Sequence, residues 1–534
     1  MRGSSLVIAG AALVAAVAHA EDPPTVGPQS TAALILQLDQ LDHVYTGTRG
    51  AVAAPSDTRV TTLSQAVAYA YQSNPRLLAE RATVRSTDYR YPAARSAYGP
   101  RLDAGAGYAF QRDRTEILAG QFISQRGATS SADLVASLPL LSFGRSAAGL
   151  ADAEARIAYQ RDVLRITEAQ VLSDVISAYV GVLRDAGAVT IARENLNLLE
   201  RQLSDNRQRF AVREITATDV EQVETRVELG RAQLLTAQSQ LGISQAEFLR
   251  HVGMVPGELA QPDVLALPVT TLAQAYGVAD AESPIVRAAQ SRDKVSRAAI
   301  AAAKAEFLPR ADLRGTAQYG SVSPYTDSRR TSDMRGEVHV SLPLIDSGLR
   351  AAQLGQAREA NDADGRLLEA AMRDTRAAVA AAWNELTGAR ESLGRYRAAT
   401  EAAARAYSGT VLQEKAGART TLDTLELARD LLTVRNNYNN ALANEYLARA
   451  ALLSAMGRLE APMLVPGIPA YDPMTHFRKV RDHGDIPLLT GLLSALDGAG
   501  SGKPRVDRLS RDPAGRLAVD APVPLSKEEA QTPP

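Results

Sequence analysis

Residues whose side chains catalyse reactions or bind metals are few in this 534-residue sequence. Cysteine is absent, which excludes disulfides, thiolate metal sites and thiol nucleophiles. Six histidines occur, at positions 19, 43, 251, 339, 476 and 483, and none has the HExxH spacing of a zinc site. The GxxxxGK(S/T) phosphate loop and the GxSxG nucleophile motif are also missing. We therefore expect no catalysis and no cofactor, and any energy must come from a partner protein.

Two acidic residues form a candidate pair of another kind. Asp423 and Glu426 lie three residues apart in the segment Gly417–Glu426, a spacing that puts both carboxylates on one face of a helix. Acidic residues near a helix start also interact favourably with the helix dipole. The residues alone therefore favour a solvated helix start over a binding site.

The composition points to long helices rather than to a compact aromatic core. Lys and Arg (59) balance Asp and Glu (60), so the chain carries no large field that would recruit nucleic acid. Phe (7) and Trp (1) are scarce. Long helices with small contact residues fit this composition better.

The first 20 residues have the form of a signal peptide. Arg2 precedes an apolar run from Leu6 to Ala18, and Ala18-His19-Ala20 resembles a signal-peptidase site. The run is shorter than the ~20 residues that span a bilayer, although a short membrane helix is the alternative. We expect export with cleavage after Ala20, and no other segment that could span a membrane as a helix. Without cysteine, a lipid anchor on an N-terminal Cys is excluded.

The remaining chain contains two similar halves, 61–260 and 261–459. Short motifs recur first at an offset of 209 residues and later at an offset of 204, which indicates a duplicated domain-sized unit with one shortened loop. The matched motifs are Thr62–Ala66 with Thr271–Ala275, Leu138–Leu140 with Leu342–Leu344, Gly144 with Gly348, and Asp219 with Asp423.

Each half contains two segments with strand periodicity. Apolar and polar residues alternate at about 100–112 and 131–141, and again at about 309–321 and 332–345. Their lengths suit tilted strands that cross a bilayer, although half-buried soluble hairpins alternate equally well. The polar stretches Asp113–Thr129 and Ser321–Ser332 are expected to be exposed hairpin loops.

Long helices follow the strands, at 144–209 and 217–252 and at 348–412 and 420–457. From Arg145 to Arg209 no proline occurs, and such a helix would be roughly 97 Å long. Val171, Val175, Ala178 and Val182 begin a spacing of four and three residues that is typical of a coiled-coil seam. Four strands cannot close a membrane barrel, so strands from other copies must complete it.

These motifs, in order and duplicated, resemble the TolC outer-membrane factors from about Thr61 to Leu459. The resemblance implies an α+β membrane protein: a trimeric 12-stranded outer-membrane barrel, with four strands per chain, continued by a coiled-coil periplasmic tunnel. It also implies a passive channel in contact with outer-membrane lipid, a periplasmic adaptor protein and an inner-membrane ABC or other pump. A soluble periplasmic coiled-coil scaffold is the alternative from another class.

The resemblance also assigns a gate. Asp423 and Glu426 would form two acidic rings in the tunnel, and three copies would attract cations. Arg419 would be a latch that bonds to Thr218 and Asp219 across a subunit boundary. Glu414 stands where the family often has tyrosine, and we expect it to repel Asp219.

Two further segments lie outside the two halves. Residues 21–60 form an N-terminal extension, and 460–534 is a Pro/Gly-rich tail that we expect to be mostly extended or disordered. Within the tail, Tyr471-Asp472-Pro473 and His476–Arg481 resemble a motif of the type I secretion branch. This favours export of a protein or polysaccharide over multidrug or metal efflux by the same fold.

Overall fold

The computed structural model describes residues 59–321 and 330–500. The predicted signal peptide and nearly all of the N-terminal extension lie outside the described residues, as do 322–329 and 501–534.

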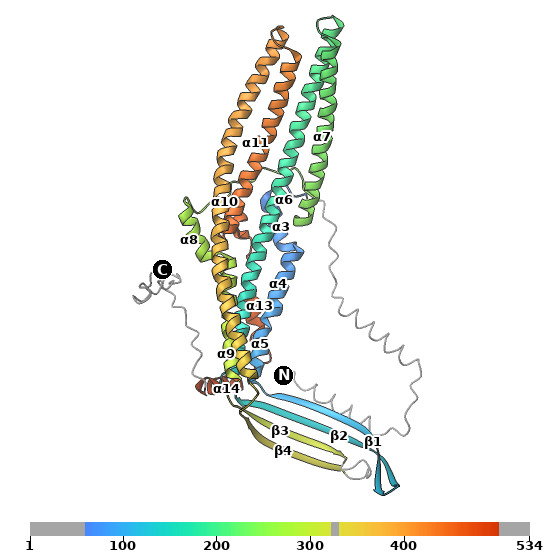
Figure 1. The fold of residues 1–534 in the computed structure, drawn as a ribbon, viewed down its shortest axis with the longest axis vertical. Coiled ribbons are helices and arrows are strands. Elements are labelled where there is room, and N and C mark those ends of the chain that lie inside the picture. Colours follow the sequence, from blue (N-terminus) through green and yellow to red (C-terminus); the bar gives the residue numbers. More distant parts are fainter. Residues whose placement is uncertain (1–58, 322–329, 501–534) are drawn as a thin grey trace, which may run out of the picture. The chain divides into compact units, whose positions relative to one another are not determined.

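The first half begins with short helices, continues with two strands and ends with two long helices (Figure 1). Its elements are α3 (Leu63–Ser73), α4 (Pro75–Asp88), α5 (Arg90–Arg95), η1 (Ser96–Tyr98), β1 (Arg101–Leu118), β2 (Gln121–Leu141), α6 (Arg145–Ala211) and α7 (Ala217–Val252).

The second half repeats this order, and three short helices follow it. Its elements are α8 (Leu272–Glu282), α9 (Pro284–Ala305), β3 (Arg310–Ser321), β4 (Arg330–Ser341), α10 (Leu349–Lys415) and α11 (Thr421–Ala455), and the tail contains α12 (Ala461–Leu464), α13 (Pro473–Val480) and α14 (Pro487–Gly500).

The two longest helices, α6 and α10, start in the same way. Each has 67 residues, or roughly 100 Å at 1.5 Å per residue. Gly144 and Gly348 precede them with φ of 90° and 89°, a left-handed conformation that glycine adopts without a steric penalty. The glycine in each half thus lets the chain turn from strand into helix.

The seam of α6 faces the other helices. Val171, Val175 and Val182 are buried in the main apolar core, which α6 shares with α3, α7, α8, α10 and α11. Tyr179 is fully buried there, and its hydroxyl donates to the carbonyl of Ala260 at 2.6 Å. An 18-residue stretch of α6 has a mean hydropathy of 1.4, and by length and composition this helix could cross a membrane. The expectation that no segment after the signal peptide could span a membrane as a helix was therefore wrong by length and composition. The hydropathy of α6 is high because its coiled-coil seam is apolar and packs against other helices.

The four strands form one antiparallel sheet in the order β1-β2-β3-β4. Leu134 of β2 lies opposite Ala317 of β3, which lies opposite Met334 of β4, so one apolar row crosses the sheet. Leu102 and Phe110 of β1 are 65 % and 67 % exposed. An exposed apolar strand surface fits contact with lipid.

The first hairpin is longer than predicted. The segment Asp113–Thr129, expected to be a loop, continues both strands to a tight turn at Gly120. The guanidinium of Arg114 stacks over the ring of Phe122 at 4.4 Å, and the Glu116 carboxylate accepts from the Gly120 amide at 2.7 Å. These local contacts stabilise a strand pair that the polar composition concealed. β2 ends at Leu141 after a register shift between Pro139 and Leu141, whereas β4 ends at Ser341, before the predicted end at 345.

The tail is folded up to residue 500, so the expectation of an extended or disordered tail was wrong for this part. A proline stands at the first or second position of α12, α13 and α14, where its missing N–H costs no hydrogen bond. In α13, His476 Nδ1 lies 2.8 Å from the fully buried Asp88 carboxylate of α4. Helices this short show little periodicity in a sequence, and docking against the preceding elements stabilises them.

Candidate gate at the helical hairpin tips

The candidate site lies at the turns that join α6 to α7 and α10 to α11. Each following helix begins with a capping box, in which a threonine and an aspartate three residues later hydrogen-bond each other's backbone. Thr420 donates its amide to Asp423 at 3.0 Å and its hydroxyl at 2.9 Å. Thr216 does the same for Asp219 at 3.0 and 2.7 Å.

These hydrogen bonds shift the titration of both aspartates. The amide and hydroxyl of Thr420 lower the pKa of Asp423, and the hydroxyl and amide of Thr216 lower the pKa of Asp219, because both donors favour the ionised carboxylate. Both aspartates are therefore charged at neutral pH and fixed at a helix start.

The predicted acidic pair faces away from the packed side of α11. Glu426 is exposed and Asp423 partly exposed, whereas Thr424 and Leu425 between them are buried. Leu425 belongs to a small apolar cluster below the tips, formed with Leu199 and Leu203 of α6 and with Val223 and Val227 of α7. This cluster fixes the rotation of α11, so that both carboxylates point to the unpacked face.

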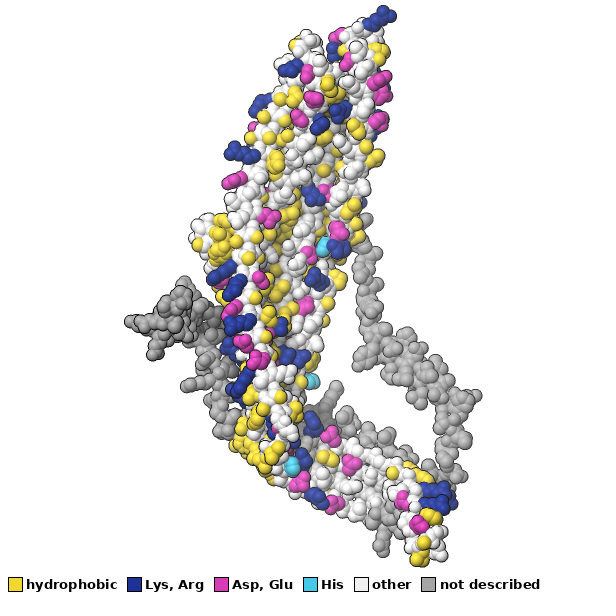
Figure 2. Space-filling view, viewed as in Figure 1, with side chains coloured by type: hydrophobic (Ala, Val, Ile, Leu, Met, Phe, Trp, Pro, Cys, Tyr) yellow, Lys and Arg dark blue, Asp and Glu magenta, His cyan; other side chains and the backbone are white. Residues whose placement is uncertain are grey.

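The predicted latch arginine, Arg419, lies beside the first turn of α11, the helix that it precedes. Arg419 has a half-exposed side chain whose Nη1 is 4.0 Å from Asp423 Oδ1. Thr218 is exposed at the start of α7. Within one chain the structure thus brings Arg419 to Asp423; a bond from Arg419 to Thr218 or Asp219 of another subunit stays a prediction. Figure 2 shows acidic and basic side chains side by side at these tips.

Glu414 has partners that the sequence did not indicate. Its side chain is buried, and its carboxylate accepts from the Thr421 hydroxyl at 3.0 Å and from the Gln202 amide at 3.5 Å. Arg209 Nη1 lies 3.5 Å from the same carboxylate. The repulsion expected between Glu414 and Asp219 stays a prediction, and Arg209 places a positive charge beside Glu414.

Arg209 is the functional candidate that sequence reasoning missed. It extends from the last turn of α6, pairs with Glu214 at 3.0 Å as well as with Glu414, and its charge also lowers the pKa of Asp219. One arginine thereby connects the two hairpin tips of a single chain. Its only sequence signal is a basic residue in the last helical turn, which usually indicates no more than interaction with the helix dipole.

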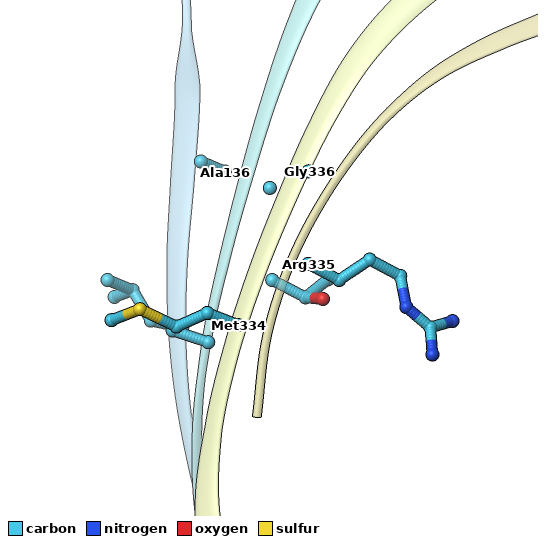
Figure 3. A pocket seen from close by; sticks show the side chains of 8 residues that line it. Ala136, Met334, Arg335 and Gly336 are labelled. Atoms are coloured by element: carbon cyan, nitrogen blue, oxygen red, sulfur yellow. The ribbon is translucent and has the colours of Figure 1, made fainter. Parts of the chain in front are cut away.

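A hollow on the sheet offers no comparable chemistry. It has about 400 Å³ and is lined by residues of β2, β3 and β4. Ala136 has a short side chain, and Gly315 and Gly336 have none, so little covers the sheet surface there. Figure 3 shows Met334 and Arg335 pointing to opposite sides of the ribbon, as strand alternation requires. The hollow thus belongs to the apolar strand surface. Among the residues with described positions, no cluster of His, Asp or Glu could hold a metal ion.

Comparison with known families accounts for both halves of the chain. The model of the family described as outer membrane efflux protein matches residues 67–253 and 275–458. The chain belongs to the outer membrane efflux protein family. The two matches fall on the two halves and confirm the duplication. The membership decides between an outer-membrane channel and a soluble scaffold in favour of the channel, with the long helices in the periplasm.

The outer membrane efflux relatives are distant in sequence but match over most of their length. Outer membrane efflux protein BepC of Brucella suis is 28 % identical over 79 % of this chain and 91 % of its own length. Outer membrane protein TolC of Escherichia coli is 24 % identical, with 74 % and 82 % covered. Alkaline protease secretion protein AprF of Pseudomonas aeruginosa is 26 % identical, with 54 % and 62 % covered.

Solved structures of such channels share the fold. The chain aligns with CusC at a TM-score of 0.64 and 16 % identity, covering 76 % of this chain and 95 % of the other. The open state of Neisseria gonorrhoeae MtrE gives 0.64 and 20 %, with 77 % and 94 % covered. The predicted fold class is thereby confirmed, and both family and fold are those of channel proteins.

Proposed function

We propose that this outer membrane efflux protein is the passive exit channel of a type I system that secretes a polypeptide, working with a periplasmic adaptor and an inner-membrane ABC pump. The observation that carries the cargo class is the tail motif Tyr471–Arg481. Independently of this motif, one relative, AprF, is named for secretion of alkaline protease.

The tail motif is built into the body of the protein. The Tyr471 amide donates to the Tyr71 hydroxyl at 3.1 Å, and the Arg81 guanidinium lies over both tyrosine rings, at 4.4 and 4.9 Å. A cation between two aromatic faces stabilises such a dock. These contacts support a specific role for the segment over that of a loose strap.

Efflux of small molecules is the second candidate. BepC is named an efflux protein, and Pseudomonas putida TtgF is named for a toluene efflux pump. To separate the two, the gene would be deleted in its host and restored as wild type or without residues 471–481. In the strain restored without residues 471–481, we expect specific polypeptides to disappear from the medium, while resistance to organic solvents and drugs is retained. Loss of resistance with unchanged secretion would overturn the type I assignment.

The assembly follows from the edges of the sheet. In the described sheet, β1 and β4 each pair with one neighbour, and unsatisfied strand edges do not persist in lipid. Three chains would close a 12-stranded barrel and bring three copies of Asp423 and Glu426 around one axis. We propose that these six carboxylates form the acidic rings and that Arg419, Thr218, Asp219 and Glu414 belong to the latch.

Single-channel recording in planar bilayers tests the gate. Wild type should form small cation-selective pores blocked by divalent cations, because carboxylate rings attract cations. In Asp423→Ala/Glu426→Ala the block should be relieved and the selectivity reduced. A matched control is Glu401→Ala, which removes an exposed acid from α10. Unchanged block in the double variant would exclude the ring assignment while leaving the channel intact.

A further inference from the structure

The tail helix α14 is fixed to the point where β2 passes into α6. Thr490, Leu493 and Asp497 form its inner face and are 5 %, 4 % and 2 % exposed. The Asp497 carboxylate accepts from the Ser142 amide at 3.0 Å, from the Ser142 hydroxyl at 2.8 Å and from the Gly144 amide at 3.0 Å. A buried carboxylate with several donors is a strong and specific contact.

The internal duplication shows that this contact is built into the fold. In the second half, Asp346 occupies the place of Ser142, and its carboxylate accepts from the Gly348 amide at 3.2 Å. Gly348 corresponds to Gly144. The first half therefore has serine where the second half has an acid, and α14 supplies the carboxylate from the tail. This equivalence gives Asp497 a defined docking role.

The outer face of α14 is apolar. Leu492 and Leu496 are 62 % and 47 % exposed and lie four residues apart, with Gly491 and Ala495 exposed beside them. The charged residue of α14 is Asp497, which the dock buries. Exposed leucines on a helix face without charge are typical of contact with an apolar phase.

The position of this face indicates which apolar phase covers it. α14 packs on β2, an inner strand of the sheet, whereas neighbouring chains would pair at the edge strands β1 and β4. At the corresponding strand-to-helix connection of the second half, Leu344 and Ile345 are 82 % and 92 % exposed. Figure 2 shows hydrophobic side chains gathered where the long helices meet the strands. The face of α14 therefore continues the lipid-contacting surface of the strands.

We propose that α14 is an interfacial helix that inserts Leu492 and Leu496 into the periplasmic leaflet of the outer membrane. The chain has no cysteine to carry an acyl anchor. Insertion of these two leucines into the lipid, together with the contacts of Asp497, would fix the height of the first strand-to-helix junction relative to the bilayer.

Tryptophan fluorescence with brominated phospholipids tests this proposal. The chain has one tryptophan, Trp383, so Leu496→Trp in a Trp383→Phe background gives a single probe. In phosphatidylcholine vesicles brominated near the headgroup, the reconstituted channel should lose emission, because bromine quenches at close contact. Leu235→Trp, on the exposed side of α7, is the matched control and should keep its emission.

Two other outcomes would overturn the proposal. Red-shifted, unquenched emission at residue 496 would mean that the face is in water. Blue-shifted, unquenched emission would mean that a protein surface, such as another copy of the chain, covers it. If Leu496→Trp does not assemble on size-exclusion chromatography, Ala495→Trp probes the same face and is scored in the same way.

Discussion

Replacing Arg209 by glutamine should loosen the contact between the two hairpin tips of one chain. The substitution keeps a polar side chain but removes the cation that pairs with Glu414 at 3.5 Å. The Glu414 carboxylate stays buried and retains the Thr421 hydroxyl and the Gln202 amide. It would then be a buried charge without a counterion, which folded proteins disfavour.

The size of the effect can be bracketed from the geometry. Two unit charges 3.5 Å apart attract by about 5 kcal/mol at an effective dielectric constant of ~20, and by about 1 kcal/mol in bulk water. The Arg209 side chain is 24 % exposed, so solvent screens part of the attraction. We expect a loss of about 2 kcal/mol, which raises the population of locally opened tips roughly 30-fold.

Hydrogen exchange followed by mass spectrometry measures this opening. Peptides covering residues 412–424 should exchange faster by that factor in Arg209→Gln than in wild type, while peptides of the buried part of α6 stay unchanged. Arg207→Gln is the matched control, because Arg207 lies on the same helix and pairs at 3.2 Å with Glu224, both side chains being more than half exposed. An exposed pair of this kind contributes less than about 1 kcal/mol.

A second substitution tests the cause. If Arg209 acts through Glu414, then Glu414→Gln should remove most of the effect of Arg209→Gln, because residues in direct contact show non-additive changes. Equal exchange in wild type and Arg209→Gln, or fully additive effects in the double variant, would refute the assigned tip contact.

Three further predictions follow from the described contacts. The lowered pKa of Asp423 means that its capping box stabilises the start of α11 above pH ~4 and is lost as the pH falls through the lower folded pKa; a spin label on Ala418→Cys should become more mobile in that range. Asp88→Asn weakens the pairs to α13 and α6 and should raise protease cleavage in the 466–472 loop several-fold. Gly457→Ala would place its Cβ 2.8 Å from the Glu282 carbonyl at a φ of +74° and should lower Tm, with a loss of at least ~1 kcal/mol.

Each of these predictions has its own control. Spin-label mobility should lose its dependence on acid pH in Asp423→Asn, and a persistent transition would assign it to another group. For the tail, Asp362→Asn removes a carboxylate that is 70 % exposed and should leave cleavage unchanged; equal cleavage in Asp88→Asn would contradict the dock. Gly467→Ala has a φ of +89° and open space around the new Cβ, so a Tm loss equal to that of Gly457→Ala would show that strain alone accounts for both.

The parts of the fold that the sequence predicted are those specified by local periodicity. Strand alternation and proline-free helical stretches are visible over windows of ten or more residues, and they led to the four strands and the long helices. The first hairpin was predicted too short because the residues after Arg112 do not alternate between apolar and polar, although Arg114 and Phe122 interact across the strands. The tail helices α13 and α14 were not predicted because Asp88 and Ser142, which form hydrogen bonds with them, are more than 350 residues away in the chain.

The site was predicted in the same uneven way. The TxxD spacing at Thr216 and Thr420 is a local signal for a capping box, so the positions of Asp219 and Asp423 at helix starts could be read from sequence. The partner of Glu414 could not, because Arg209 reaches it only after α6 and α10 have packed at a particular height. Contacts between the two hairpins depend on tertiary packing, which no local pattern encodes.

Comparison of the two halves shows that the acidic residues of the proposed gate lie mostly on the second hairpin. At the offset of 204 residues, Asp423 corresponds to Asp219, but Glu426 corresponds to Gln222 and Glu414 to Phe210. The shared aspartate serves helix capping in both halves, which is a structural task. The positions that correspond to Glu426 and Glu414 carry no acid in the first half, and Phe210 at one of them is 46 % exposed. A gate that depends on acidic rings should therefore respond to changes on α11 and tolerate Gln222→Ala on α7, whereas a gate formed equally by both hairpins would respond to both.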